Sequence, residues 1–371
     1  MSMRDLVANA KRIVIKIGSS TLTGSGAGLD ASAVDRLVDV VADARKRGIE
    51  VLVVSSGAIA AGLAPLGLHA RPKDLSTQQA AASVGQGLLI HRYTESFARY
   101  GITASQVLLT TTDVVRRSHY SNAQRALFKL ISMGVVPVIN ENDTVGTSEI
   151  RFGDNDRLAA LVALLTQADL LVIVSDIDAL YDAPPSNPSA KKISEVKDLN
   201  EIANIKLGGA GTGVGSGGMV TKIDAAKIST GAGTAMLLTS AADLAKAIKG
   251  EEFGTCFYAK ENKNNSRALW LAHASASSGK LVLDQGAVKA LIEKNVSLLP
   301  AGVTSLEGTF DSGDTVDLVD SNGKIIARGI VNFGSDEIPQ MLGRSTKELA
   351  ATLGAEFERE LVHRDDLVIL N

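Results

Sequence analysis

The chain has 371 residues, of which 45% are hydrophobic and 21% are charged, and its formal net charge is −3. This length allows two domains and a sizeable core, and the composition is that of a globular protein. Its near-neutral charge excludes a global attraction to nucleic acid or to an anionic membrane. The single cysteine, Cys256, excludes an intrachain disulfide, and we expect it to be a small packed residue.

The first residues contain no apolar stretch as long as that of a signal peptide. No run in the chain reaches the roughly 18 apolar residues that span a bilayer. A lone cysteine also fits a reducing compartment. The sequence therefore predicts a cytoplasmic protein that does not contact the membrane.

Apolar runs alternate with segments of helical period along the first part of the chain. Runs rich in β-branched residues predict buried strands at 12–17, 51–55, 135–139 and 170–175. The segments between them predict helices at 31–47, 75–100, 121–133 and 157–167. This alternation predicts an α/β fold, a three-layer sandwich with a mainly parallel sheet between helices. Ligands of such sheets bind beyond the carboxyl ends of the strands, where the sequence places Gly18, Ser55, Ser56, Asn140 and Ser175.

The character of the chain changes near residue 278. Segment 263–278 is rich in Asn, Ser, Ala and Lys and predicts a linker. A strand from Gly279, a short helix at 286–294 and turn signals at 311–314 and 321–324 then predict a small, mainly β module. The module has nine Lys and Arg against fifteen Asp and Glu, a net charge of −6. The predicted domains are a catalytic domain at 1–262, the linker at 263–278 and the module at 279–371.

A polar cluster follows the strand predicted at 135–139. Asn140-Glu-Asn-Asp143 comes first, and Gly153-Asp-Asn-Asp156 follows about ten residues later. Such side chains at the carboxyl end of a strand can hold the charged groups of a small zwitterion and leave room for a phosphate donor. The alternative is a polar turn in which Asp156 caps the helix that starts near Arg157.

Two lysines stand beside segments that can bind phosphate. Lys16 interrupts an apolar strand and precedes a Gly-Ser-Ser turn, whose backbone N–H groups can cradle phosphate oxygens. Lys222 ends the glycine-rich segment 208–222, which enters a predicted helix whose first N–H groups suit a polyphosphate. The alternatives are a surface lysine before an ordinary turn, and a flexible glycine linker.

Several competing site types are excluded or disfavoured. Gly-Lys followed by Ser or Thr occurs nowhere, so the sequence has no Walker A loop. The glycine run lacks the strand, turn, helix and acidic residue of a dinucleotide fingerprint. Five scattered histidines show no spacing of metal ligands.

Five motifs follow one another along the first part of the chain: Lys16-Ile-Gly-Ser-Ser, Ser55-Ser-Gly-Ala-Ile-Ala-Ala-Gly, Pro137-Val-Ile-Asn-Glu-Asn-Asp, Phe152-Gly-Asp-Asn-Asp and Gly217-Gly-Met-Val-Thr-Lys. In their order and spacing, these motifs resemble the amino-acid kinase superfamily, and within it the kinases that act on glutamate. The C-terminal module resembles a PUA domain through segments 279–287 and 297–303.

The resemblance implies an enzyme that transfers a phosphoryl group from ATP to the γ-carboxylate of L-glutamate. The products would be L-glutamyl 5-phosphate and ADP, in the first step of proline biosynthesis. A carboxylate is already a nucleophile at neutral pH, so the reaction needs positioning and charge neutralisation rather than a general base. The resemblance further implies Mg²⁺ on the phosphates, a homodimer or homotetramer, and L-proline as a candidate feedback inhibitor.

Carried over by position, the resemblance also implies roles for single residues. Lys16 and Lys222 would bracket the phosphates, with Asp156 paired to both and Asp154 supporting the same catalytic network. The residues expected to bind glutamate are Ser56, Asn140, Asn155 and Asp143, the last at the α-ammonium. The residues expected to hold the nucleotide are Lys16, Gly18, Ser175, Asp176, Ser216, Gly217, Gly218, Met219, Val220, Thr221 and Lys222. No side chain is expected to be a direct ligand of the metal.

Two other functions stay open from the sequence. A kinase of the same superfamily could act on carbamate, acetylglutamate, aspartate or UMP. PUA modules often bind RNA, but the charge of −6 on residues 279–371 opposes contact with a phosphate backbone. Nucleic acid is therefore not an expected partner.

Overall fold

The computed structural model describes residues 2–23, 28–110, 113–114, 117–145, 155–184, 187–202, 218–259, 277–294 and 296–370. The chain divides into two compact units, and each is described by itself. The larger unit is Met1–Val114 with Ser121–Lys263, and the smaller is Val115–Tyr120 with Asn264–Asn371. Most of the predicted linker at 263–278 lies outside the described residues.

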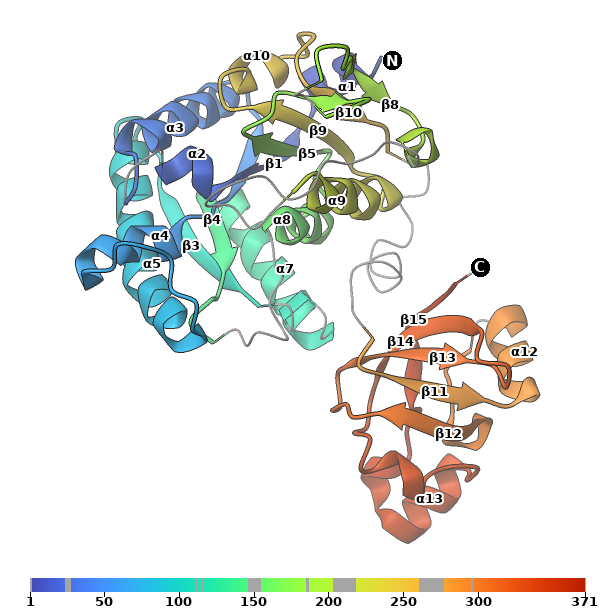
Figure 1. Ribbon diagram of the computed structural model, residues 1–371. Helices are drawn as coiled ribbons and strands as arrows, with labels where there is room; N and C mark the ends of the chain where they lie inside the picture. Colours follow the sequence, from blue (N-terminus) through green and yellow to red (C-terminus); the bar gives the residue numbers. More distant parts are fainter. Residues whose placement is uncertain are drawn as a thin grey trace. The chain divides into compact units, whose positions relative to one another are not determined.

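The larger unit is built on an eight-stranded sheet of order β3-β4-β2-β1-β5-β9-β10-β8 (Figure 1). Its neighbouring strands run parallel except β9 and β10, which are antiparallel. The strands are β1 (Arg12–Ile17), β2 (Glu50–Val54), β3 (Ala104–Leu109), β4 (Val136–Glu141), β5 (Leu170–Ser175), β8 (Glu195–Val196), β9 (Ala235–Ser240) and β10 (Thr255–Phe257). A small antiparallel pair, β6 (Leu180–Tyr181) and β7 (Lys192–Ile193), follows β5.

Helices cover both faces of this sheet, and its central strands are therefore buried on both sides. On one face, apolar residues of α1 (Met3–Asn9), α3 (Ala31–Lys46), α5 (Leu75–Ala98) and α10 (Leu244–Ala247) join the main core. On the other face lie α8 (Asn155–Leu165) and α9 (Met219–Gly231), as Figure 1 shows. The remaining α-helices described in this unit are α2 (Ser19–Thr23), α4 (Ala58–Leu63) and α7 (Arg117–Ser132), the last of which belongs to it from Ser121 onward. The predicted α/β fold with a mainly parallel sheet is confirmed.

The start of α8 corrects one sequence-based interpretation. The helix begins at Asn155, so Asp156 lies inside its first turn instead of capping it. The interpretation of Asp156 as the N-cap is therefore wrong. The carboxylate of Asp156 instead pairs with lysines of two other elements, as described below.

The smaller unit has a five-stranded sheet of order β12-β11-β13-β14-β15. Its strands are β11 (Gly279–Leu283), β12 (Val303–Gly308), β13 (Thr315–Val319), β14 (Ile325–Val331) and β15 (Val362–Ile369), with helices α12 (Gln285–Lys294) and α13 (Thr346–Leu353). The predicted turn at 321–324 joins β13 to β14, and Gly323 supplies its positive φ of 80°. This confirms the small, mainly β module expected from the sequence.

None of the helices in the described ranges is both long enough and apolar enough to cross a membrane.

Candidate functional site

Two lysines and one aspartate meet at the carboxyl edge of the large sheet. Lys16 Nζ lies 2.6 Å from Asp156 Oδ1, and Lys222 Nζ lies 3.2 Å from Asp156 Oδ2. Lys16 comes from the end of β1, whereas Asp156 and Lys222 stand in the first turns of α8 and α9. The exposed fractions are 5% for Lys16, 0% for Asp156 and 6% for Lys222. Three segments far apart in the sequence therefore build one buried ionic cluster.

The charges in this cluster stabilise one another. Burial by itself would raise the pKa of Asp156, but the ammonium groups of Lys16 and Lys222 hold that pKa below its ordinary value. The hydroxyl of Thr221 adds a hydrogen bond of 3.0 Å to Asp156 Oδ2. Asp156 is consequently a carboxylate at neutral pH, and it holds two ammonium groups in place where water is nearly excluded. Charges in such a setting attract a phosphate more strongly than charges in bulk water do.

Gly18 lies beside the same cluster. A Cβ placed on Gly18 would stand 3.8 Å from Lys16 Nζ, so the backbone after β1 passes close to the ammonium group. Ser19 and Ser20, expected in a turn, open the short helix α2 instead. Backbone N–H groups at this point would add to the lysine charge if a phosphate bound there.

A second polar cluster surrounds the side chain of Asn155. Its Nδ2 lies 2.7 Å from the carbonyl oxygen of Ser55, 2.9 Å from Ser56 Oγ and 2.9 Å from Asn140 Oδ1. Asn140 Oδ1 also accepts a hydrogen bond of 2.9 Å from the backbone N–H of Glu141. The ends of β2 and β4 and the start of α8 thus bring Ser56, Asn140 and Asn155 together. Because Asn155 and Asp156 are consecutive, this cluster adjoins the lysine cluster.

Asp143 lies in the turn that follows β4 and is half-buried. It is close in sequence to Asn140, whose side chain belongs to the Asn155 cluster. The predicted catalytic residue Asp154 lies outside the described residues.

Apart from Lys16 and Gly18, the described residues expected to hold a nucleotide lie at the carboxyl end of β5 and at the start of α9. Ser175 ends β5, and its hydroxyl donates to Asp176 Oδ1 at 2.9 Å. Gly218 is the N-cap of α9, and Met219, Val220 and Thr221 follow it in the first turn. Val220 is 54% exposed, so its apolar side chain is accessible at the start of α9. Ser216 and Gly217 lie outside the described residues.

The sequence placed Ser55 at a strand end but did not point to Tyr93 or to the contact between the two hydroxyl groups. Tyr93 is completely buried in α5, and its hydroxyl lies 3.0 Å from Ser55 Oγ. A tyrosine on the apolar face of a helix is typical of a core residue, so the pattern held no signal for this contact. Thr221 was expected at the nucleotide, and its bond to Asp156 was likewise not anticipated.

Within the described ranges, no group of three or more His, Cys, Asp or Glu side chains could hold a metal ion. The described side chains therefore offer no cage for Mg²⁺.

Comparison with known proteins identifies the family of the chain. Residues 11–253 match the model of the amino acid kinase family, and residues 279–353 match that of the PUA domain. A glutamate 5-kinase of Streptomyces coelicolor is 58% identical over 369 residues, which cover 99% of each chain. A glutamate 5-kinase of Thermobifida fusca is 57% identical over 98% of this chain and 94% of its own, and one of Bifidobacterium adolescentis is 47% identical over 99% and 98%. With this similarity over its whole length, the chain belongs to the amino-acid kinase family and, within it, to the glutamate 5-kinases that carry a C-terminal PUA domain.

Proposed function

We propose that the protein phosphorylates the γ-carboxylate of L-glutamate with ATP, giving L-glutamyl 5-phosphate and ADP in the first step of proline biosynthesis. The observation that carries this proposal is the buried cluster of Lys16, Asp156 and Lys222. Its place at the strand ends, next to the polar cluster around Asn155, provides one region for a phosphate donor and another for an acceptor.

In the reaction, an oxygen of the γ-carboxylate forms a bond to the γ-phosphorus of ATP. The bond from that phosphorus to the β,γ-bridging oxygen breaks, and its electron pair stays on ADP. The acceptor is ionised at neutral pH, so no side chain needs to remove a proton. What the protein contributes is alignment of the two substrates and neutralisation of charge on the phosphoryl group.

We assign this neutralisation to Lys16 and Lys222. Asp156 keeps both ammonium groups in fixed positions, so they need not reorganise as charge moves during the transfer. The backbone at Gly18, which passes close to Lys16 Nζ, is proposed to offer N–H groups to the same phosphoryl group. Asp154 is proposed to support this network, on the basis of its position in the motif alone.

Glutamate is proposed to bind at Ser56, Asn140, Asp143 and Asn155. The two hydrogens of the Asn155 carboxamide are shared among three acceptors, on Ser55, Ser56 and Asn140, and no donor among the described residues reaches its oxygen. That oxygen suits an ammonium group, which offers donors only. The carboxylate of Asp143 is proposed as the ionic partner of the α-ammonium.

The nucleotide is proposed to lie against Ser175, Asp176 and the start of α9, from Ser216 to Lys222. Because the described side chains offer no metal cage, Mg²⁺ would arrive on the phosphates, held by phosphate oxygens and water. When bound, the ion neutralises phosphate charge, which the lysines of the protein also do.

Further properties follow from the family rather than from described contacts. We propose a homodimer or homotetramer, feedback inhibition by L-proline, and a cytoplasmic location, which the single buried Cys256 supports. The excess of acidic residues in 279–371 supports the view that nucleic acid is not a partner.

The proposal is tested by measuring ADP release from the purified full-length chain with ATP, Mg²⁺ and a panel of acceptors. L-Glutamate should be the fastest substrate, and hydroxylamine should trap the acyl phosphate as a hydroxamate. Faster turnover of aspartate, acetylglutamate, carbamate or UMP would refute the choice of acceptor. ADP release without hydroxamate would refute acyl phosphate formation.

A further inference from the structure

Ser55, which the sequence placed at the ligand edge of the sheet without a role of its own, has every polar group engaged. Its backbone N–H donates to the carbonyl oxygen of Ile139 at 2.8 Å, and its own carbonyl oxygen accepts from Asn155 Nδ2 at 2.7 Å. Its hydroxyl donates to the carbonyl oxygen of Ser56 at 3.2 Å and lies 3.0 Å from the Tyr93 hydroxyl. Ser55 thereby joins β2 to β4, α8 and α5 at the position where the Asn155 cluster begins.

The direction of the bond to Tyr93 follows from these contacts. We assign Tyr93 as the donor to Ser55 Oγ, because the single hydrogen of the Ser55 hydroxyl then reaches the carbonyl oxygen of Ser56 and both hydroxyl hydrogens have an acceptor. Burial raises the pKa of Tyr93 well above its ordinary value, so the phenol keeps this hydrogen at neutral pH. The Tyr93 hydroxyl thus fixes which way the Ser55 hydroxyl points.

The helix that carries Tyr93 is itself held firmly against the site. A Cβ on Gly85 would lie 1.7 Å from the carbonyl oxygen of Ala58, and one on Gly62 would lie 1.9 Å from that of Ala81. The two glycines therefore let α5 touch α4, the helix that starts directly after the Ser55-Ser56-Gly57 turn. Gln86 of α5 also donates to the carbonyl oxygen of Glu141, at the end of β4.

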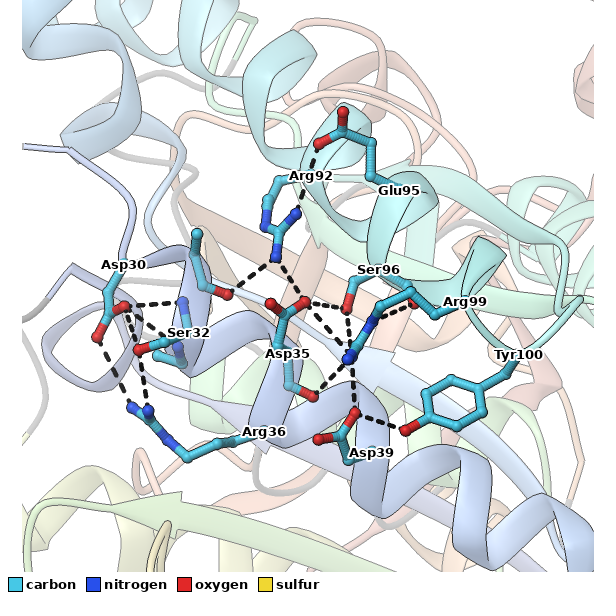
Figure 2. Close-up of polar contacts among 12 residues, drawn as sticks. Asp30, Ser32, Asp35, Arg36, Asp39, Arg92, Glu95, Ser96, Arg99 and Tyr100 are labelled. Atoms are coloured by element: carbon cyan, nitrogen blue, oxygen red, sulfur yellow. Dashed lines mark hydrogen bonds and ion pairs between the residues drawn. The ribbon is translucent and has the colours of Figure 1, made fainter.

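On another side, α5 is tied to α3 by the polar network drawn in Figure 2. Asp35 of α3 accepts from Ser96 at 2.6 Å and pairs with Arg92, both of α5. Arg99, directly after α5, pairs with Asp39 of α3 at 2.6 Å. A helix fixed on two sides is a rigid support for a hydrogen bond to the neighbouring turn.

From these contacts we infer that Tyr93 is a positioning residue for the acceptor substrate. Its hydroxyl holds Ser55, and Ser55 in turn sets the positions of Ser56 and Asn155, which are proposed to bind glutamate. The inference rests on the proposed function. A purely structural tyrosine needs only its ring in the core, a role that the stacked neighbour Phe97 fills without a hydroxyl.

The test compares the kinetics of Tyr93→Phe with those of the wild type, using the full-length chain. Phenylalanine keeps the ring and its stacking with Phe97 and removes only the donor to Ser55. We expect the glutamate KM to rise about fivefold, the effect of losing one hydrogen bond that orders the site. The ATP KM and kcat should each change less than about twofold, since the lysine cluster is untouched.

Ser55→Ala removes the other partner of the same hydrogen bond. It therefore tests the contact independently if Tyr93→Phe does not fold. It should raise the glutamate KM by at least as much as Tyr93→Phe. The double variant should be no worse than Ser55→Ala alone, because both changes act through one contact. Tyr258→Phe is the matched control: it removes a hydroxyl bonded to Glu195 in the same unit and should leave the glutamate KM unchanged.

The outcomes separate the two proposals. A wild type that turns over glutamate, with an unchanged glutamate KM in Tyr93→Phe, would overturn the positioning role alone. A loss of thermal stability or of kcat without a change in that KM would assign Tyr93 to the core and overturn it as well. A wild type that does not phosphorylate glutamate would overturn the proposed function and, with it, this inference.

Discussion

Lys16 Nζ and Asp156 Oδ1 lie 2.6 Å apart, and the side chains are only 6% and 0% exposed. β1 supplies the lysine and α8 the aspartate, so the pair joins the sheet to the helix that covers it. Removing one member of a buried pair leaves the other charge without water and without its partner. Substitutions in this cluster should therefore change stability as well as activity, and the two effects must be measured separately.

Lys222→Ala should lower kcat by at least about 100-fold, because Lys222 is proposed to stabilise charge that develops only during phosphoryl transfer. The glutamate KM should change much less, within about threefold. Steady-state ADP release measures both constants. Lys227→Ala is the control, since Lys227 stands on the same helix but pairs with Asp224 at the surface. Equal effects of the two substitutions would refute the assigned role.

Asp143→Ala should raise the glutamate KM by about tenfold or more and leave the ATP KM nearly unchanged. The reason is the loss of a charge-assisted contact with the α-ammonium group, which is stronger than a neutral hydrogen bond. Glutamate saturation curves at fixed ATP provide the measurement, with Asp224→Ala as an exposed control. If the glutamate KM of Asp143→Ala equals that of the wild type, Asp143 does not bind the substrate.

Asp156→Asn should reduce the free energy of unfolding by about 3 kcal/mol, because two buried ammonium groups lose their shared carboxylate. With an unfolding entropy of about 2 cal/mol/K per residue, that corresponds to a fall in Tm of roughly 4–6 °C. Asp224→Asn breaks a surface pair and should cost less than about 1 kcal/mol. Thermal unfolding followed by circular dichroism compares the two. A Tm of Asp156→Asn within a degree or two of the wild type would contradict the importance of the cluster for stability.

The stability difference between the wild type and Asp156→Asn should depend on pH. The pKa of Asp156 is lowered in the folded protein, so its contribution is complete above the ordinary value of 3.8 and is lost as pH falls toward the folded pKa. The wild type should thus exceed the variant by a constant margin at pH 6–8, and this margin should shrink below about pH 4. Chemical unfolding at a series of pH values tests this. A margin that grows on acidification would reverse the sign of the shift.

Much of the fold could be read from local patterns. The strand predicted at 170–175 agrees with β5 at both ends, because five consecutive apolar residues before Ser175 suit a strand buried on both faces. The helix predicted at 31–47 agrees with α3 within one residue, since its apolar residues repeat with helical period and Asp30 accepts from the N–H groups of Ser32 and Ala33. Boundaries that depend on neighbouring elements were less certain, as the start of α8 demonstrates.

The candidate site was predictable only in part. The chain pattern placed Lys16, Asn140 and Ser175 at strand ends, because parallel strands present their carboxyl ends at one edge. It did not distinguish whether Asp156 capped a helix or paired with lysines. A cap is decided by the backbone of one turn, whereas the pairing needs β1 and α9 to arrive beside α8.

The sequence by itself determined which elements form and which polar residues stand at their ends, since hydrophobic period and chain order are local properties. Only the tertiary structure decided which side chains form hydrogen bonds and ion pairs with one another. Tyr93 is the clearest case: within α5 it has the pattern of a core residue, and its hydroxyl acquires a role only because β2 ends beside it. Contacts of this kind depend on distances between segments remote in the chain, which no local pattern encodes.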